Sequence, residues 1–223
     1  MKTLIQNGTV VTHEWSKKLD VLMEDEKIGE IKPSISFDHV DTIVDATDLL
    51  VLPGGVDVHT HLALPMFDTI SSDDHYTGHK AAAFGGTTTV MDFIPHEDHD
   101  LMPNIERWHQ KAQDLAAVDY SFHMNISQFD EKVLEQLSLL VKEGIPSAKM
   151  FTAYNGRMRL GDGEIFQVMR KCAELGILPM LHAENGDVIE VLVEEAIAAG
   201  HTDPVWHARS RPAWGAVEAV LRG

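Results

Sequence analysis

Cysteine is almost absent from the 223-residue chain, which holds only Cys172. A single cysteine excludes an internal disulfide and fits a reducing compartment. Basic residues are also few, because 18 lysines and arginines face 35 aspartates and glutamates, a formal net charge of -17. Such an acidic chain is a poor partner for nucleic acid or for an anionic membrane surface. The chain also lacks a signal-like N-terminus and an apolar run of membrane-spanning length, so we expect a cytoplasmic protein.

What remains is an ordinary globular composition, with 44% hydrophobic and 24% charged residues. A chain of this length buries a full core in one or two domains. Its first 52 residues hold short β-branched segments separated by turn-like residues such as Asn7-Gly8. We predict strands there over residues 3–6, 9–11, 20–23, 28–31 and 41–46. Residues 1–52 are therefore expected to form the N-terminal part of a small β-sandwich.

The pattern changes at residue 53 to an alternation of strands and helices. Strands are predicted over residues 54–58, 87–93, 120–126, 147–151 and 177–182. Helices are predicted over residues 73–84, 104–117, 131–144, 164–175 and 187–200, the first with Ser71, Ser72 or Asp73 as its cap. Alternation of this kind favours an α/β fold with a parallel sheet. We expect residues 53–223 to form an incomplete TIM-like (β/α) barrel of about five βα units.

His59 and His61 stand two residues apart at the end of the first of these strands. Side chains alternate along an extended backbone, so both imidazoles point to the same face. Two imidazoles on one face make a good half of a metal site. The alternative is a pair of core or surface histidines with this spacing by chance.

Lys149 lies within the fourth strand, and His182 ends the fifth. Functional residues of (β/α) barrels gather at the C-terminal ends of the strands. The apolar neighbours of Lys149 would lower the pKa of its amine, which could then be modified or act as a base. The alternatives are a lysine that extends from a strand end towards water, and a structural histidine at position 182.

Several motifs in order carry a resemblance to a known family. Residues 53–61 (PGGVDVHTH), 81–93 (AAAFGGTTTVMDF), 149–156 (KMFTAYNG), 181–185 (LHAEN) and 207–212 (HARSRP) are similar to the dihydropyrimidinase and D-hydantoinase branch of the amidohydrolase superfamily. The resemblance covers the chain to about residue 212 and corresponds to the N-terminal half of such an enzyme.

The resemblance implies a site for two divalent metal ions, expected to be zinc. His59 and His61 match ligands of the more buried ion, and His182 matches a ligand of the second. Lys149 matches a lysine that is carboxylated on its amine and bridges both ions. An anionic bridge offsets the repulsion between two close cations. The implied reaction opens a hydantoin or dihydropyrimidine ring to an N-carbamoyl amino acid, by attack of an activated water.

Further positions follow from the same resemblance. Tyr154 matches the tyrosine whose hydroxyl hydrogen-bonds the substrate and the oxyanion that develops. Asp57 is expected to support the ligand strand from behind the metal ligands. We predict that apolar side chains line the pocket for the substrate's exocyclic group: Leu64, Phe67, Phe93, Phe151 and Met158.

The chain also departs from the family pattern. Relatives carry a metal-binding histidine after a sixth strand and a proton-shuttling aspartate after an eighth, and residue 223 precedes both positions. His201 and His207 lie away from any strand end and do not replace the missing histidine. We therefore expect a truncated form with an open sheet edge and little activity, and a homo-oligomer, dimer or tetramer, for the full-length enzyme.

Three other functions compete with this one. An allantoinase or a dihydroorotase would share the metal ligands, although the context of Tyr154 (FTAYNG) favours the dihydropyrimidinase branch. A non-catalytic scaffold resembling the collapsin response mediator proteins would need no ligands, and the retained histidines and Lys149 argue against it. An inactive fragment is the third. In the favoured interpretation the partner is a small cyclic amide substrate.

Overall fold

The computed structural model describes residues 1–36, 39–66 and 68–223. The chain separates into two compact units, Met1–Gly55 and Val56–Gly223. All of the helices in the described part of the chain belong to the second unit. None of them is long and apolar enough to cross a membrane.

The first unit consists of short strands in two small sheets. Its strands are β1 (Lys2–Gln6), β2 (Thr9–Val11), β3 (Ser16–Lys18), β4 (Asp20–Glu24), β5 (Lys27–Lys32), β6 (Thr42–Asp45) and β7 (Leu50–Val51). One sheet has the order β5-β4-β1-β6 and the other β3-β2-β7. Leu4, Leu22 and Ile35 form a small core, and the buried carboxylate of Asp20 accepts the N–H groups of Asn7 and Ile35 at 3.0 Å. The predicted strands are present, while their role as the N-terminal part of a small β-sandwich stays a prediction.

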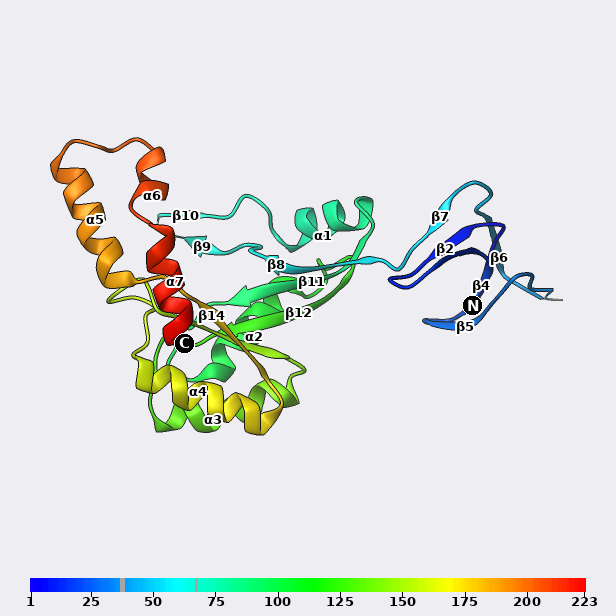
Figure 1. Cartoon of the computed structure of the whole chain (residues 1–223). Helices are drawn as coiled ribbons and strands as arrows, with labels where there is room; N and C mark the ends of the chain where they lie inside the picture. Colours follow the sequence, from blue (N-terminus) through cyan, green and yellow to red (C-terminus); the bar gives the residue numbers. More distant parts are fainter. Residues whose placement is uncertain (37–38, 67) are drawn as a thin grey trace. The chain divides into compact units, whose positions relative to one another are not determined.

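The second unit is built on a five-stranded sheet in the order β14-β13-β12-β11-β8. Its strands are β8 (Gly55–Thr60), β11 (Thr87–Ile94), β12 (Asp119–Asn125), β13 (Ser147–Phe151) and β14 (Leu178–His182). The pairings from β11 to β14 are parallel. A two-stranded ribbon of β9 (Pro65–Met66) and β10 (Thr69–Ile70) follows β8. The predicted α/β fold with a curled parallel sheet is confirmed (Figure 1).

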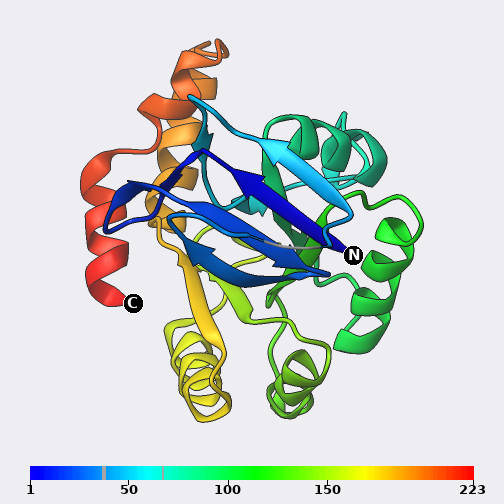
Figure 2. The same ribbon diagram turned by 90° about the vertical axis from the view of Figure 1, so that its right-hand side faces the viewer.

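Of the helices in the described part of the chain, the first four connect strands and cover the outer side of the sheet, and the other three follow β14 (Figure 2). They are α1 (His75–Phe84), α2 (Leu101–Ala112), α3 (Glu131–Lys142), α4 (Asp162–Leu175), α5 (Gly186–Ala198), α6 (Val205–Arg209) and α7 (Ala213–Arg222). The last three gather near the end of the sheet where β14 ends (Figure 1). We had no prediction for α6 and α7.

Two helix starts differ from the prediction for local reasons. The cap of α1 is Asp74 and not one of the three preceding residues, because its carboxylate accepts the Thr77 N–H at 2.8 Å while the Thr77 hydroxyl bonds back to Asp74. Helix α2 begins before Pro103, since proline is tolerated in the first turn of a helix. It ends earlier than predicted, and Asp114 just beyond it has a left-handed φ of 60°.

The main core lies between the sheet and helices α2, α3 and α4. Each strand here alternates between the helix layer and the opposite side, so half of its side chains join this core. The largest fully buried members are Ile94, Leu101, Ile105, Trp108, Phe122, Met124, Ile126, Leu137, Leu140, Ile145 and Met150. This packing fixes the strands whose C-terminal ends carry the candidate site.

Candidate functional site

The end of β8 carries the two histidines with the metal-binding spacing. The ring centroids of His59 and His61 are 5.1 Å apart, with the planes nearly perpendicular at 84°. Between them, the Thr60 hydroxyl donates to the Met91 carbonyl of β11 at 3.2 Å. The carboxylate of Asp57 accepts the backbone N–H of His59 at 3.1 Å, so its hydrogen bond supports the strand. The two imidazoles therefore share one side of β8, as the alternation predicts.

Phe93, at the end of β11, lies at the centre of this cluster. Its ring centroid is 4.5 Å from that of His59 and 5.1 Å from that of His61. The Nζ atom of Lys149 is 4.4 Å from the same ring centroid. Phe93 is only 1% exposed, so its ring is a fixed apolar floor for the three polar groups. The structure thus brings His59, His61 and Lys149 together around one side chain.

Lys149 extends from the middle of β13, whose other residues are buried. Its Nζ lies 5.3 Å from the Phe151 ring centroid, in addition to its contact with Phe93. Within the described ranges no carboxylate pairs with this amine. Burial lowers the pKa of the Lys149 amine, because removal from water disfavours the charged ammonium.

The same surroundings favour neutral imidazoles. Desolvation lowers the pKa of His59, and the nearby charge of Lys149 adds to this against an opposing effect of Asp57. For His61 desolvation again comes first, followed by the charges of His59 and Lys149. Neutral imidazole is the form that binds a metal ion, so both rings are in the form a ligand requires.

A third histidine of this cluster, His123 on β12, was missed in the sequence. Its ring centroid is 4.6 Å from that of Phe93, and Nε2–H donates to the Val58 carbonyl at 2.8 Å. Nδ1 pairs with the hydroxyl of Ser147. Both ring nitrogens are therefore hydrogen-bonded. His123 connects β8 to β13 and has no free nitrogen to bind a metal ion. In register it lies opposite Phe93, a pairing that the sequence does not report.

His182 lies at the end of β14, directly opposite Phe151 of β13 in register. Its Nε2 is 2.7 Å from Oε2 of Glu184, a charge-assisted contact that orients the ring. Its ring centroid is 5.2 Å from that of Tyr154 and 5.9 Å from that of Phe151. His182 thus joins the other candidates through Phe151, which faces both it and Lys149. Glu184, inside the motif LHAEN, was not singled out by the sequence.

Tyr154 occupies a tight loop after β13. Its φ of 68° is left-handed, which is uncommon for an aromatic residue and marks a constrained backbone. Its carbonyl accepts the N–H groups of Arg157 and Met158 at 3.1 and 3.0 Å, which closes the loop. The side-chain amide of Asn155 donates to Asp187 and Glu190 of α5, at 2.8 and 2.9 Å. The loop is held to α5, and the phenol is left 38% exposed.

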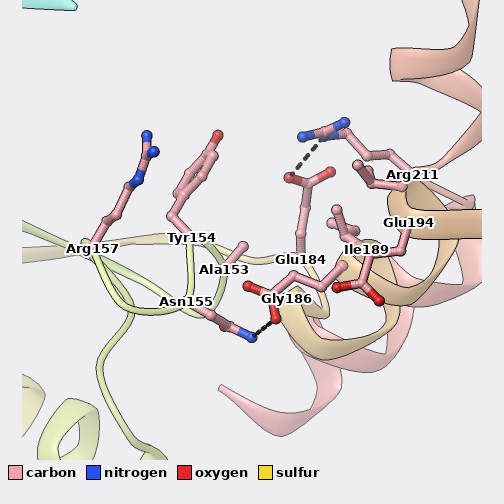
Figure 3. Close-up of a pocket in the computed structure, with 11 residues that line it drawn as sticks. Ala153, Tyr154, Asn155, Arg157, Glu184, Gly186, Ile189, Glu194 and Arg211 are labelled. Atoms are coloured by element: carbon pink, nitrogen blue, oxygen red, sulfur yellow. Dashed lines mark hydrogen bonds and ion pairs between the residues drawn. The ribbon is translucent and has the colours of Figure 1, made fainter. Parts of the chain in front are cut away.

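A cavity of about 450 Å³ opens beside Tyr154. Tyr154 and Arg157 stand on one side of it, and Glu184 and Arg211 face them from the other (Figure 3). Arg211 Nε lies 3.9 Å from the Glu184 carboxylate, the same group that contacts His182. Glu184 lines the cavity and contacts His182, so the cavity adjoins the candidate metal ligand at the end of β14.

The remaining predicted pocket residues are less closely placed. Phe151 is 6% exposed and belongs to the site through its contacts with Lys149 and His182. Leu64 is half-buried and packs against the main core, and Met158 is half-buried in the loop after Tyr154. Phe67 lies outside the described residues.

A family profile described as "Amidohydrolase family" matches residues 50–220. The chain belongs to the amidohydrolase family. It is 44% identical over 214 residues to a D-hydantoinase of Geobacillus stearothermophilus, which covers 95% of this chain and 45% of the relative. It is 40% identical to a dihydropyrimidinase of Dictyostelium discoideum over 98% of this chain and 44% of the relative. The chain thus spans about half the length of the curated relatives it matches.

Solved structures agree with the sequence comparison. A dihydropyrimidinase from Brevibacillus agri superposes with a TM-score of 0.94 at 43% identity, covering all of this chain and 48% of that one. An L-hydantoinase from Arthrobacter aurescens has a TM-score of 0.84 at 23% identity, which shows the shared fold. The dihydropyrimidinase and D-hydantoinase resemblance of the sequence motifs is confirmed.

The residues of this amidohydrolase chain fit the metal ions that the resemblance implies. No group of three histidine, cysteine or acidic side chains suited to a metal ion occurs in the described ranges. Two neutral imidazoles and an unpaired amine do meet at Phe93, and only the modified form of the amine would supply oxygen ligands. The two imidazoles are donors that suit a divalent metal ion, while carboxylation of Lys149 stays a prediction.

Proposed function

We propose that this chain provides the metal-binding half of a hydrolase that opens cyclic amides, hydantoins or dihydropyrimidines, to N-carbamoyl amino acids. The observation that carries the proposal is the gathering of His59, His61 and Lys149 around Phe93 at the ends of β8, β11 and β13. The names of the D-hydantoinase and dihydropyrimidinase relatives support the substrate class.

In this proposal His59 and His61 hold one metal ion through neutral ring nitrogens, and His182 holds a second. Lys149, carboxylated on Nζ by carbon dioxide with release of a proton, would supply oxygen ligands to both ions, and burial favours the neutral amine that this reaction needs. When bound, the ions would act as Lewis acids on the substrate carbonyl and would make a water molecule more acidic. Phe93 and Phe151 keep bulk water from the bridging group, which strengthens the electrostatic interactions there.

Tyr154 has a separate role at the substrate. Its exposed hydroxyl stands at the edge of the cavity beside His182, where it can donate to an oxygen that becomes negative during attack. The backbone bonds that close its loop keep the phenol in place before substrate arrives. Substrate preference within the cyclic amides, the cytoplasmic location and the oligomer of the full-length enzyme stay predictions.

The metal content of the purified chain tests the proposal. We expect zinc to bind, and His59→Ala and Lys149→Ala each to lose most of it, with small carboxylates in excess partly restoring binding to the Lys149 variant. His201→Ala is the matched control, because His201 stacks on Trp206 at 3.9 Å outside the site. Full metal content in the Lys149 variant would contradict the bridging role.

Activity gives a second test. The resemblance places a metal-binding histidine after a sixth strand and a proton-shuttling aspartate after an eighth. Neither is among these residues. General acid–base help is worth about 10²–10⁴-fold, so we expect no ring opening by this polypeptide above a zinc-only control. A chelator-sensitive rate of ring opening by this polypeptide alone would refute that catalytic scheme. If the chain binds zinc but shows no ring opening after the C-terminal half of the enzyme is added, a non-catalytic scaffold is favoured.

A further inference from the structure

The two residues directly after His61 are held against the helix layer by three contacts. The backbone N–H of Leu62 donates to Oδ1 of Asp92 at 3.2 Å. The Leu62 side chain sits where Gly78 of α1 leaves room, since a Cβ there would come within 2.4 Å of it. Lys111 of α2 donates from Nζ to the Ala63 carbonyl at 2.9 Å. The end of β8 is therefore anchored from behind.

Asp92 is the most unusual of these anchors because it is an acidic residue only 1% exposed. Its other oxygen accepts the indole N–H of Trp108 at 3.2 Å, and Nε2 of His75 lies 3.9 Å from that oxygen and has no hydrogen-bond partner among the described residues. A buried carboxylate is costly unless hydrogen-bonded donors surround it. Burying the Asp92 carboxylate costs free energy, and the residue lies at a strand end next to the candidate site. A role in that site would account for this cost.

The position of Asp92 in β11 links it to the site. Phe93, the next residue, faces the other side of the sheet and touches the rings of both β8 histidines. Neighbouring residues of one strand thus contact the same short segment from its two sides. Phe93 limits where the imidazoles can lie, and Asp92 limits where the backbone behind them can lie.

We propose that Asp92 is a positioning residue for the metal ligands of β8, which fixes the end of the strand through the N–H of Leu62 and so sets the aim of His61. The proposal rests on the proposed function for the metal role of that histidine. Asp92 touches neither substrate nor ligand ring, so its effect passes through the backbone. Loss of a residue that holds a metal ligand in place without binding the metal weakens metal affinity by about 10–100-fold.

Burial raises the pKa of Asp92 to about 6, against hydrogen bonds from Phe93, Leu62 and Trp108 and the charge of Lys111 that lower it. The side chain is therefore a carboxylate at pH values well above 6, where two acceptor oxygens are available for two N–H donors. The test is made in that range.

The experiment compares the zinc affinity of three variants with that of the parent chain, by competition with a chromophoric chelator. We expect Asp92→Ala to bind zinc about 10–100-fold more weakly. Asp92→Asn should recover part of the loss, because its amide oxygen can still accept the Leu62 N–H. Trp108→Phe removes the second donor to Asp92 but keeps an aromatic ring next to Nζ of Lys111, and should keep the parent affinity.

A fourth variant separates positioning from general loss of stability. Asn104 is fully buried and bonds the backbone around the start of α2, away from β8. Asn104→Ala should lower the stability of the second unit and leave zinc affinity unchanged. Equal losses of affinity in the Asn104 and Asp92 variants would overturn the proposal, as would parent-like affinity in Asp92→Ala. If Asp92→Ala does not fold, the other two variants decide. The proposal is overturned when Asp92→Asn binds zinc as tightly as the parent chain and Trp108→Phe binds zinc more weakly than the parent chain.

A metal-free readout keeps this inference distinct from the proposed function. In nuclear magnetic resonance spectra, Asp92→Ala should speed amide hydrogen exchange at Leu62 and shift the ring signals of His61, while Asn104→Ala should do neither. If the parent chain binds no zinc, the proposed function fails, and these two signals alone decide the positioning role. Unchanged exchange at Leu62 and an unchanged His61 ring would refute it.

Discussion

The buried Asp92 and His75 should make opposite contributions to the pH dependence of stability, and removing one should expose the other. Burial raises the pKa of Asp92 from 3.8 to about 6 and lowers that of His75 from 6.5 to about 4. Lys111 of α2 and His79 and Asp74 of α1 are the other charged or titratable groups that act on the pair.

The sign of each contribution follows from which state binds the proton. At a pH between about 4 and 6, folded Asp92 is protonated and unfolded Asp92 is not, so its contribution falls as the pH rises through the folded pKa. His75 is protonated only in the unfolded chain over the same range, so its contribution rises with pH. Each shift is worth roughly 3 kcal/mol at about 1.4 kcal/mol per pKa unit, and the two nearly cancel.

Asp92→Asn removes one of the two contributions while burial still acts on His75. The free energy of unfolding of the variant minus that of the parent should therefore rise by roughly 3 kcal/mol from about pH 4 to 6 and be level above that. Urea unfolding followed by helical circular dichroism measures it, since the helices of the described part lie in the second unit. A difference that stays constant with pH would refute the reasoning, because Asp92 would then titrate alike in both states.

Three other outcomes follow from single positions. Phe93→Ala should lower the free energy of unfolding by about 3–5 kcal/mol in urea titrations, because a fully buried ring leaves a cavity, and a loss below 1 kcal/mol would contradict its packing. Gly186→Ala should destabilise by about 1–3 kcal/mol, since its Cβ would lie 2.6 Å from Oδ1 of Asn155, whereas Gly163→Ala meets nothing within 4 Å and should be neutral or slightly stabilising. Cys172 should resist alkylation in the folded protein, because burial raises its pKa to about 11, and rapid labelling without urea would show that α4 opens.

Much of the second unit could be predicted because its strands are local features. The β-branched run before Asp92 and the apolar neighbours of Lys149 mark strands without any tertiary information. The spacing of His59 and His61 also fixes their shared side, since alternation is a property of the backbone. The cap of α1 was misplaced by one residue, because several adjacent polar residues could each have accepted the N–H that Asp74 accepts.

The other functional groups depend on contacts between distant segments. His123 belongs to the site only because β12 lies between β11 and β13, which places it against Phe93 and Val58. Glu184 is recognised only through its contacts with the ring of His182 and with Arg211, which lies between α6 and α7 far along the chain. No periodicity or spacing reports such contacts, so the sequence alone leaves them out.

Asp92 and Phe93 face opposite sides of the sheet, so the alternation of side chains along β11 has to keep each of them on its own side. Insertion or deletion of one residue in the run before them would exchange the two sides, which would place a carboxylate among the imidazoles and a phenyl ring against Trp108. A change of two residues would restore both assignments and only alter where the strand begins. Length variation in this strand should therefore be tolerated in even steps alone, whatever substrate the enzyme accepts.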